Sequence, residues 1–232
     1  SKVISNSTTN TRDVATFVLT TGGTLTVHAA SFDADDNYVQ DVSVTWSVSG
    51  GIGSLNPATG VTSILTATTP GSGQITADHP TLIDDATGTI TVNSGSLAFI
   101  KIVEGPGGNG PELNTKSLTA DDVLTVHAAG YDAQGNYIGD QTVTWSSTGT
   151  LAPALSGSGP SITFNPKTAP ASGTISASHA TAGSDATGAI TVGVGNAHRG
   201  QILSGQNGQR SDHRRADHRW HPGHARRQLR CR

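Results

Sequence analysis

The chain of 232 residues contains one cysteine, Cys231, and no methionine. A single cysteine excludes a disulfide within the chain, so any folded part must be held together by packing, which is compatible with either redox compartment. Aromatic residues make up 4% of the sequence and charged residues 13%. No apolar run approaches the length of a bilayer span, so we expect no membrane insertion in this segment.

Motifs for chemistry are also scarce. No Ser, His and acidic residue occur in a pattern that would indicate a nucleophile. The Gly-rich run Gly105–Gly110 lacks the Lys-Ser/Thr pair and the following helix of a phosphate-binding loop. We therefore expect no catalytic residues, no cofactor and no enzymatic activity.

What the chain does contain is Val, Ile, Leu, Thr, Ser and Gly, a composition typical of β-rich proteins with short turns. Its charge is unevenly divided. Residues 1–198 hold four Lys, one Arg and fifteen acidic residues, a net charge of minus ten. Residues 199–232 hold nine Arg and two Asp, a net charge of plus seven. The acidic body argues against nucleic acid or an anionic membrane as its partner.

The body of the chain consists of two copies of one unit. His28 and Trp46 recur 99 residues later as His127 and Trp145, and Thr87–Val92 recurs as Thr187–Val192. A period of this length indicates tandem domains, which we place at residues 1–94 and 95–195. Lys2–Asn6 aligns with Lys101–Gly105, so we expect the first domain to be truncated at its N-terminus. An initiator Met and any signal peptide would then lie upstream, so their absence is no argument for a cytoplasmic protein.

Each unit shows the alternation of a half-buried strand. Leu124 and Val126 alternate with polar residues, as do Leu25 and Val27 in the first copy. Asp132–Asn136 is rich in turn-forming residues, which predicts a hairpin between the Leu124 strand and the strand of Val143 and Trp145. Further short strands are expected at 161–164, 173–177 and 187–192. The predicted fold is all-β, with tandem immunoglobulin-like sandwiches whose cores contain the residues Leu25, Val27, Trp46, Leu124, Val126 and Trp145.

The run from Leu124-Thr-Val-x-Ala through Asp132-Ala-x-Gly-Asn136 to Val143-Thr-Trp145 resembles the bacterial immunoglobulin-like (Big) repeats of invasin- and intimin-type surface proteins. The resemblance covers residues 1 to about 195. The first copy departs from the motif at Asp36, which replaces the turn Gly. The resemblance implies an exported, cell-surface or secreted protein in which the repeats form a stalk or an adhesive tip. No catalytic residues are carried over.

Residues 196–232 differ in composition from the two repeats, and we expect them to be disordered. Their His and Arg residues could form a metal site or bind a polyanion, but a shifted reading frame explains them better. Read one base later, the codons of residues 216–231 permit a sequence close to Leu19–Ala34, with a Gly forced at Trp220–His221. We interpret the tail as the frameshifted start of a third repeat and expect no metal site in it.

Two smaller sets of residues remain. Asp33, Asp35 and Asn37 resemble the start of a calcium loop, but the downstream acidic ligand is missing, so a solvated hairpin turn is the favoured interpretation. His28 and His127 alternate with core residues and are expected to point outward. His79 and His179 end equivalent strands, and duplication explains both pairs.

Two functions are compatible with these patterns. The first is a non-enzymatic structural or adhesive segment of a bacterial surface protein, whose partners are neighbouring repeats and a host-surface or glycan ligand. The alternative is a pair of accessory carbohydrate-binding modules of a secreted polysaccharide-active enzyme. A row of exposed aromatic side chains would favour the alternative.

Overall fold

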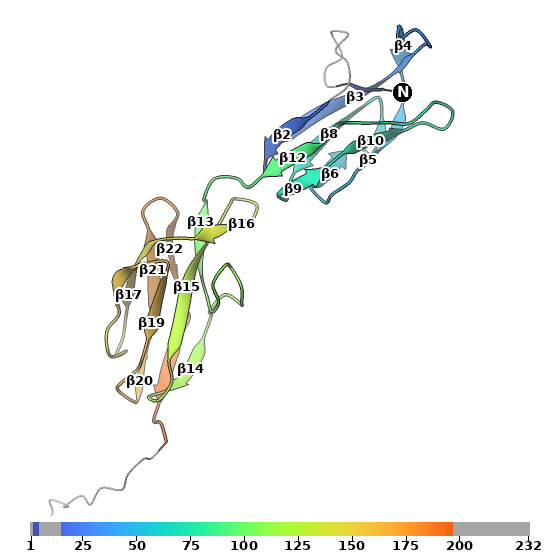
Figure 1. Ribbon diagram of the computed structural model, residues 1–232. Coiled ribbons are helices and arrows are strands. Elements are labelled where there is room, and N and C mark those ends of the chain that lie inside the picture. Colours follow the sequence, from blue (N-terminus) through green and yellow to red (C-terminus); the bar gives the residue numbers. More distant parts are fainter. Residues whose placement is uncertain (1, 5–14, 197–232) are drawn as a thin grey trace, which may run out of the picture. The chain divides into compact units, whose positions relative to one another are not determined.

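The computed structural model describes residues 2–4 and 15–196, which form 23 short strands and no helix (Figure 1). This part of the chain is therefore all-β, and it includes no helix that could cross a bilayer. All of these strands belong to one compact unit that ends at Asn196. The predictions for the tail, including the absence of a metal site at its His residues, concern residues 197–232 and lie outside the described residues.

The first sandwich is built from two facing layers. One layer has the strand order β1-β3-β8-β6, with β4 also paired to β3. The other contains β11-β10-β5-β7 and β2-β12-β9, in which β9 and β10 are separated only by Gln74. The strands are β1 (Lys2–Ile4), β2 (Phe17–Thr20), β3 (Thr24–Phe32), β4 (Tyr38–Asp41), β5 (Val44–Val48), β6 (Gly53–Asn56), β7 (Thr59–Gly60), β8 (Thr62–Ala67), β9 (Gly71–Gly73), β10 (Ile75–Asp78), β11 (Asp85–Ala86) and β12 (Ile90–Asn93).

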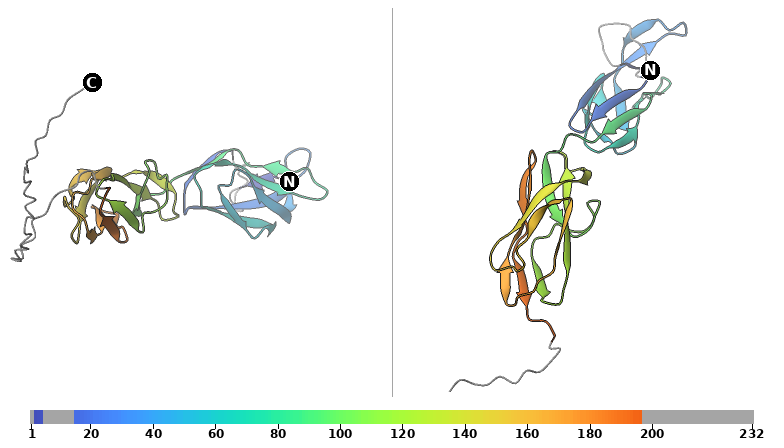
Figure 2. Two further views of the ribbon diagram at one scale, coloured as in Figure 1. Left: turned by 90° about the horizontal axis from the view of Figure 1, so that it is seen from below. Right: turned by 60° about the vertical axis from the view of Figure 1, so that its left-hand side comes forward.

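The second sandwich has the same two-layer plan without a counterpart of β6. Figure 2 shows both sandwiches from two further sides. One layer has the order β13-β15-β16, with β19 also paired to β15, and the other contains β18-β17-β21-β22 and β14-β23-β20. The strands are β13 (Phe99–Val103), β14 (Lys116–Thr119), β15 (Leu124–Tyr131), β16 (Tyr137–Asp140), β17 (Val143–Ser147), β18 (Ser156–Gly159), β19 (Ser161–Phe164), β20 (Ala171–Gly173), β21 (Ile175–His179), β22 (Gly183–Ala186) and β23 (Ile190–Gly193).

Each sandwich begins with a strand that is split between its two layers. β1 pairs antiparallel with β3, and β2 then pairs parallel with the last strand, β12. In the second sandwich β13 pairs with β15, and β14 pairs parallel with β23. The Trp-bearing strand lies in the layer opposite β3 in the first sandwich and opposite β15 in the second. Together with this placement, the strand order is that of an immunoglobulin-like sandwich.

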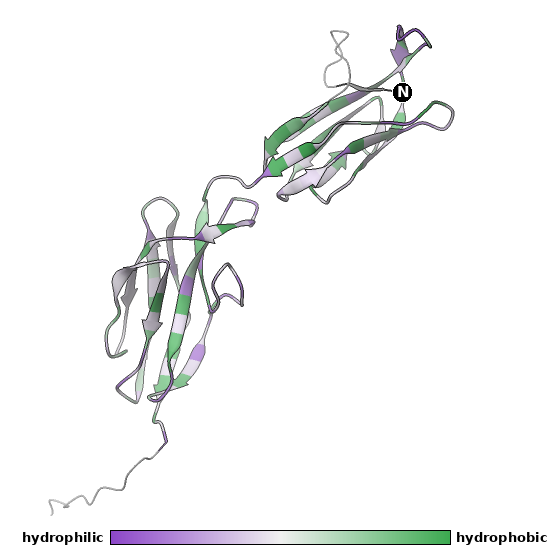
Figure 3. Ribbon diagram, in the orientation of Figure 1, coloured by the Kyte–Doolittle hydropathy of each residue, from purple (hydrophilic) through white to green (hydrophobic). Residues whose placement is uncertain are grey.

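Each sandwich has its own hydrophobic core. Leu25 and Val27 on β3 face Trp46 on β5, and all three side chains are at most 6% exposed. Leu124 and Val126 on β15 occupy the same places opposite Trp145. Apolar and polar residues alternate from Leu124 to Ala128 on β15 (Figure 3), because over this stretch only one face of the strand is turned to the core.

Each indole is fixed by a hydrogen bond as well as by packing. Trp46 Nε1 donates to the backbone oxygen of Gly60 at 2.9 Å, and Trp145 Nε1 donates to that of Gly159, also at 2.9 Å. A buried indole N–H needs such an acceptor. The Trp side chain is therefore held in the same way in both cores.

The predicted hairpin forms, but with a different second strand. The Asp132–Asn136 turn joins β15 to β16, and β17 with Trp145 lies in the other layer. The reason is that Val143 and Trp145 must enter the core from the side opposite Leu124 and Val126. The change at Asp36 does not alter the turn, since Asp36 has a φ of 64° where Gly135 has 84°. Asp tolerates this left-handed conformation better than most residues.

A buried threonine supports the same strand in both sandwiches. Thr187 Oγ1 accepts a hydrogen bond from the backbone N–H of Ile175 at 3.0 Å, and Thr87 does the same for Ile75. We expect Thr187→Val to lower the free energy of unfolding of the second sandwich by about 1–3 kcal/mol, because a buried N–H loses its acceptor. Urea denaturation measures the change. Thr187→Ser keeps the hydroxyl and should cost less, and equal losses for both variants would contradict this role.

Candidate functional site

The turn between β15 and β16 is organised by the carboxylate of Asp132. Asp132 Oδ1 accepts hydrogen bonds from the backbone N–H groups of Gln134 at 3.0 Å and Asn136 at 2.8 Å. Asn136 Nδ2 lies 3.2 Å from Oδ1 and 3.1 Å from Oδ2. An Asp at the start of a turn closes it in this way by bonding to the backbone ahead of it.

The second oxygen of this carboxylate connects the two sandwiches. Thr21 Oγ1, just after β2, donates to Asp132 Oδ2 at 2.6 Å. The backbone N–H of Gly95, in the linker after β12, lies 2.8 Å from Thr21 Oγ1 and 3.1 Å from Asp132 Oδ2. We call Thr21, Gly95 and Asp132 the junction triad. The triad joins one residue of the first sandwich, one of the linker and one of the second sandwich.

Two further contacts surround the triad. Asn136 Nδ2 donates to the backbone oxygen of Thr68 in the first sandwich at 2.9 Å. Gly22 lies so close to Gln134 that an added Cβ would be 3.0 Å from Gln134 Nε2. The Asp132 side chain is consequently fully buried, and Thr21 is only 7% exposed.

The electrostatics of Asp132 reflect these contacts. Burial by itself would raise the pKa of the Asp132 carboxyl, but hydrogen bonds from Thr21, Asn136 and Gly95 outweigh burial and hold that pKa well below its usual range. The group is thus a carboxylate at neutral pH and accepts from donors on every side. A buried charge with this many donors is a strong candidate for a functional contact.

The three calcium candidates lie together in the equivalent turn of the first sandwich. Asp33 Oδ1 accepts from the backbone N–H groups of Asp35 and Asn37, both at 2.9 Å. Asn37 turns its amide nitrogen, which cannot ligate a cation, toward the Asp33 carboxylate. Within residues 2–4 and 15–196 no three His, Cys, Asp or Glu side chains are placed to share a metal ion. This geometry is that of a hydrogen-bonded turn.

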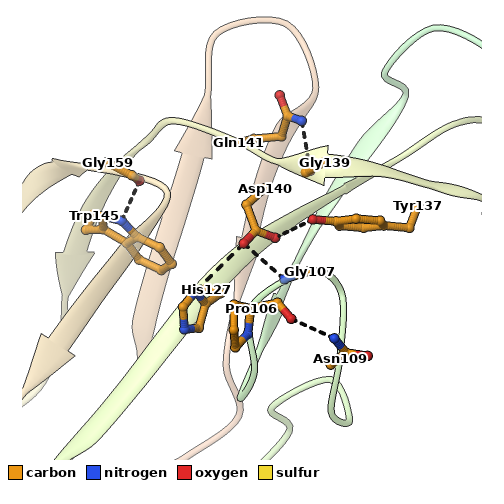
Figure 4. Close-up of polar contacts among 10 residues, drawn as sticks. All are labelled: Pro106, Gly107, Asn109, His127, Tyr137, Gly139, Asp140, Gln141, Trp145 and Gly159. Carbon is orange, nitrogen blue, oxygen red and sulfur yellow. Dashed lines mark hydrogen bonds and ion pairs between the residues drawn. The ribbon is translucent and has the colours of Figure 1, made fainter.

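A second group of polar side chains surrounds Asp140 on β16 (Figure 4). Tyr137 donates its hydroxyl to Asp140 Oδ1 at 2.9 Å, and the backbone N–H of Gly107 donates to Oδ2 at 3.2 Å. His127 Nδ1 lies 3.8 Å from Oδ2, with its side chain 17% exposed. His127 is thus largely covered, although it lies on the outer face of β15. Asp140 therefore anchors the Gly-rich loop to the sheet.

The other histidine pair has a structural task. His79 Nδ1 accepts from the backbone N–H groups of Thr81 and Leu82, both at 3.3 Å. His179 Nδ1 accepts from those of Thr181 and Ala182, both at 3.2 Å. Each ring therefore closes the turn that follows its strand.

The aromatic side chains of the second sandwich pack on one another. Phe99 and Tyr131 are stacked with centroids 5.5 Å apart, and Tyr131 meets Tyr137 edge-on at 6.0 Å. Tyr137 is 37% exposed, while Phe99 and Tyr131 are half-buried. Stacking occupies ring faces that a sugar would need, so this group is not an open row of platforms.

No protein-family model matches the chain, and no curated protein matches it. Several solved structures resemble it. The C-terminal fragment of intimin, solved with the intimin-binding domain of the translocated intimin receptor, is 18% identical, with a TM-score of 0.28, over 78% of this chain and 61% of that one. The Escherichia coli adhesin FdeC is 20% identical, with a TM-score of 0.34, over 79% and 62%.

Extracellular domains 3–5 of Drosophila OTK are 12% identical, with a TM-score of 0.37, over 78% of this chain and 63% of that one. The chain thus spans less than two thirds of the length of each of these structures. The description of both sandwiches as immunoglobulin-like rests on their own strand pairing.

Proposed function

We propose that residues 1–94 and 95–195 are two bacterial immunoglobulin-like domains of a cell-surface or secreted protein. In this proposal they form a non-enzymatic stalk or adhesive segment, and each domain has the neighbouring repeat as its first partner. A host-surface or glycan ligand would be bound elsewhere along the array.

The junction triad is the observation that carries this proposal. The linker Asn93-Ser-Gly-Ser96 has the composition of a flexible connection, in which joined domains would move independently. Here, however, the Gly95 amide is bonded to both Thr21 and Asp132, and neither side chain is open to water. A stalk needs this kind of contact, because repeats joined only by a flexible linker would not hold a distal region away from a surface.

Backbone ¹⁵N relaxation tests the proposal. We expect the two sandwiches of the full chain to share one rotational correlation time. Thr21→Val keeps the side-chain shape but removes the hydroxyl, which costs about 1–3 kcal/mol at a buried site, so the correlation times should separate and shorten. Thr20→Val is the matched control, because Thr20 is the exposed neighbour of Thr21. Independent tumbling in the unaltered chain would overturn the stalk.

The carbohydrate-binding alternative requires a sugar to dock on the exposed tyrosine side chains. Tyr38 is 55% exposed and Tyr137 is 37% exposed, and each lies beside one hairpin turn. A glycan array probed with the full chain separates the two functions. Signals that disappear in both Tyr38→Ala and Tyr137→Ala would favour carbohydrate modules, whereas an empty array would remove them.

A further inference from the structure

The Asp33–Asn37 turn of the first sandwich has nearly the same internal hydrogen bonds as the Asp132–Asn136 turn of the second. The second of these turns is the one that contacts the first sandwich through the junction triad. Asp33 Oδ1 accepts from two backbone N–H groups and from Asn37 Nδ2, as Asp132 Oδ1 does from its own turn. The two turns differ at the other oxygen. Asp132 Oδ2 also accepts from Thr21 and Gly95, whereas among the described residues Asp33 Oδ2 accepts only from Asn37 Nδ2, at 3.0 Å.

We infer that the Asp33 turn is a docking site for the end of another sandwich that offers a Thr hydroxyl and a Gly backbone N–H, as Thr21 and Gly95 do. The inference rests on the proposed function and extends it, since it gives the first sandwich a specific preceding neighbour. Asp33 is exposed in the present chain, and docking would bury it as Asp132 is buried. The proposed contact at Asp33 is of the same type as the junction triad.

The ends of the two sandwiches are not interchangeable. Ala120 N donates to Gly193 O at 3.1 Å just as Thr21 N donates to Asn93 O at 2.9 Å, so Ala120 occupies the place of Thr21. Ala120 has no hydroxyl to donate. The end of the second sandwich therefore lacks one of the two donors that the Asp132 turn uses.

Charge strengthens this distinction. Asp121 follows Ala120, and its Oδ2 accepts from the backbone N–H of Asn196 at 2.9 Å. A carboxylate thus lies at this end, where the first sandwich has Gly22. The Asp33 turn also carries Asp35 and Asp36, so an end with Asp121 would meet like charges. The Asp33 turn therefore accepts a sandwich end that carries Thr21 and Gly95 and rejects one that carries Ala120 and Asp121.

A chain with three sandwiches tests the inference. A copy of residues 1–99 joined to Ser1 of the full chain preserves the 99-residue spacing. It places a second Thr21 and Gly95 ahead of the Asp33 turn. With the added copy labelled with ¹⁵N, hydrogen exchange of its Gly95 amide can be compared with that of the original Gly95, which serves as the internal reference.

We expect exchange of the added Gly95 amide to be slowed at least tenfold relative to the same fusion carrying Thr21→Ala in the added copy. Asp33→Ala in the acceptor turn should remove the protection, while the original Gly95 amide stays protected in both variants. Equal exchange in all three fusions, with the original amide still protected, would overturn the inference and leave the stalk intact. Loss of protection at the original Gly95 in the unaltered chain would instead overturn the proposed function.

Discussion

Replacement of Trp145 by Ala is expected to destabilise the second sandwich by about 3–5 kcal/mol, since truncation of a buried Trp removes its contacts and leaves a cavity. Trp145 is 1% exposed and is among the largest fully buried side chains of the described residues. Because single domains are commonly stable by about 5–15 kcal/mol, this loss is a large fraction of the total. Calorimetry should show the transition of the second sandwich at a markedly lower temperature.

Two comparisons make this expectation specific. Trp145→Phe keeps a ring but leaves the Gly159 oxygen without its indole donor, so its cost should be smaller, about 1–2 kcal/mol. Trp46→Ala should lower the transition of the first sandwich instead, because Trp46 belongs to the other core. If Trp145→Ala lowered both transitions equally, the two cores would not be separate units of stability.

The core of each sandwich could be predicted because its pattern is local. Alternation at Leu124 and Val126, with a Trp placed after the turn, is enough to identify a buried strand face and the side chain opposite it. The position of the Trp strand could not be predicted in the same way. Sequence order favoured pairing β17 with β15, whereas packing across the core puts β17 in the other layer.

The junction triad shows a second limit of prediction from the sequence. Asp33 and Asp132 stand at the same position of nearly identical turns, yet Asp33 is exposed and Asp132 is fully buried. The hydrogen bonds within the two turns do not distinguish them, because the burial of Asp132 comes from Thr21 and Gly95, 111 and 37 residues away. One signal was available in the sequence: Thr21 in the first copy is replaced by Ala120 in the second. A donor present in only one copy points to a contact that only one copy makes.

Replacement of Asp132 by Ala is expected to lower the stability of the second sandwich by about 3 kcal/mol, because more than one buried donor loses its acceptor. The same change should release the first sandwich, so that the two correlation times separate as for Thr21→Val. Asp33→Ala is the matched control, since it opens an equivalent turn that is exposed and joins nothing among the described residues. Denaturation followed by circular dichroism, with ¹⁵N relaxation for the junction, measures both effects.

The contribution of Asp132 should also depend on pH in a defined direction. Its folded pKa lies below the ordinary value of 3.8, so the folded state binds a proton less readily than the unfolded state. The stabilisation is therefore complete above about pH 3.8 and is lost as the pH falls below that value toward the folded pKa. The pKa values of Asp33 and Asp122 are lowered as well, by hydrogen bonds with Asn37 and Thr119, and add slopes of the same sign. Subtracting the pH profile of Asp132→Ala from that of the unaltered chain isolates Asp132, and a difference that stayed constant down to pH 2 would mean that the carboxylate charge does not hold the junction.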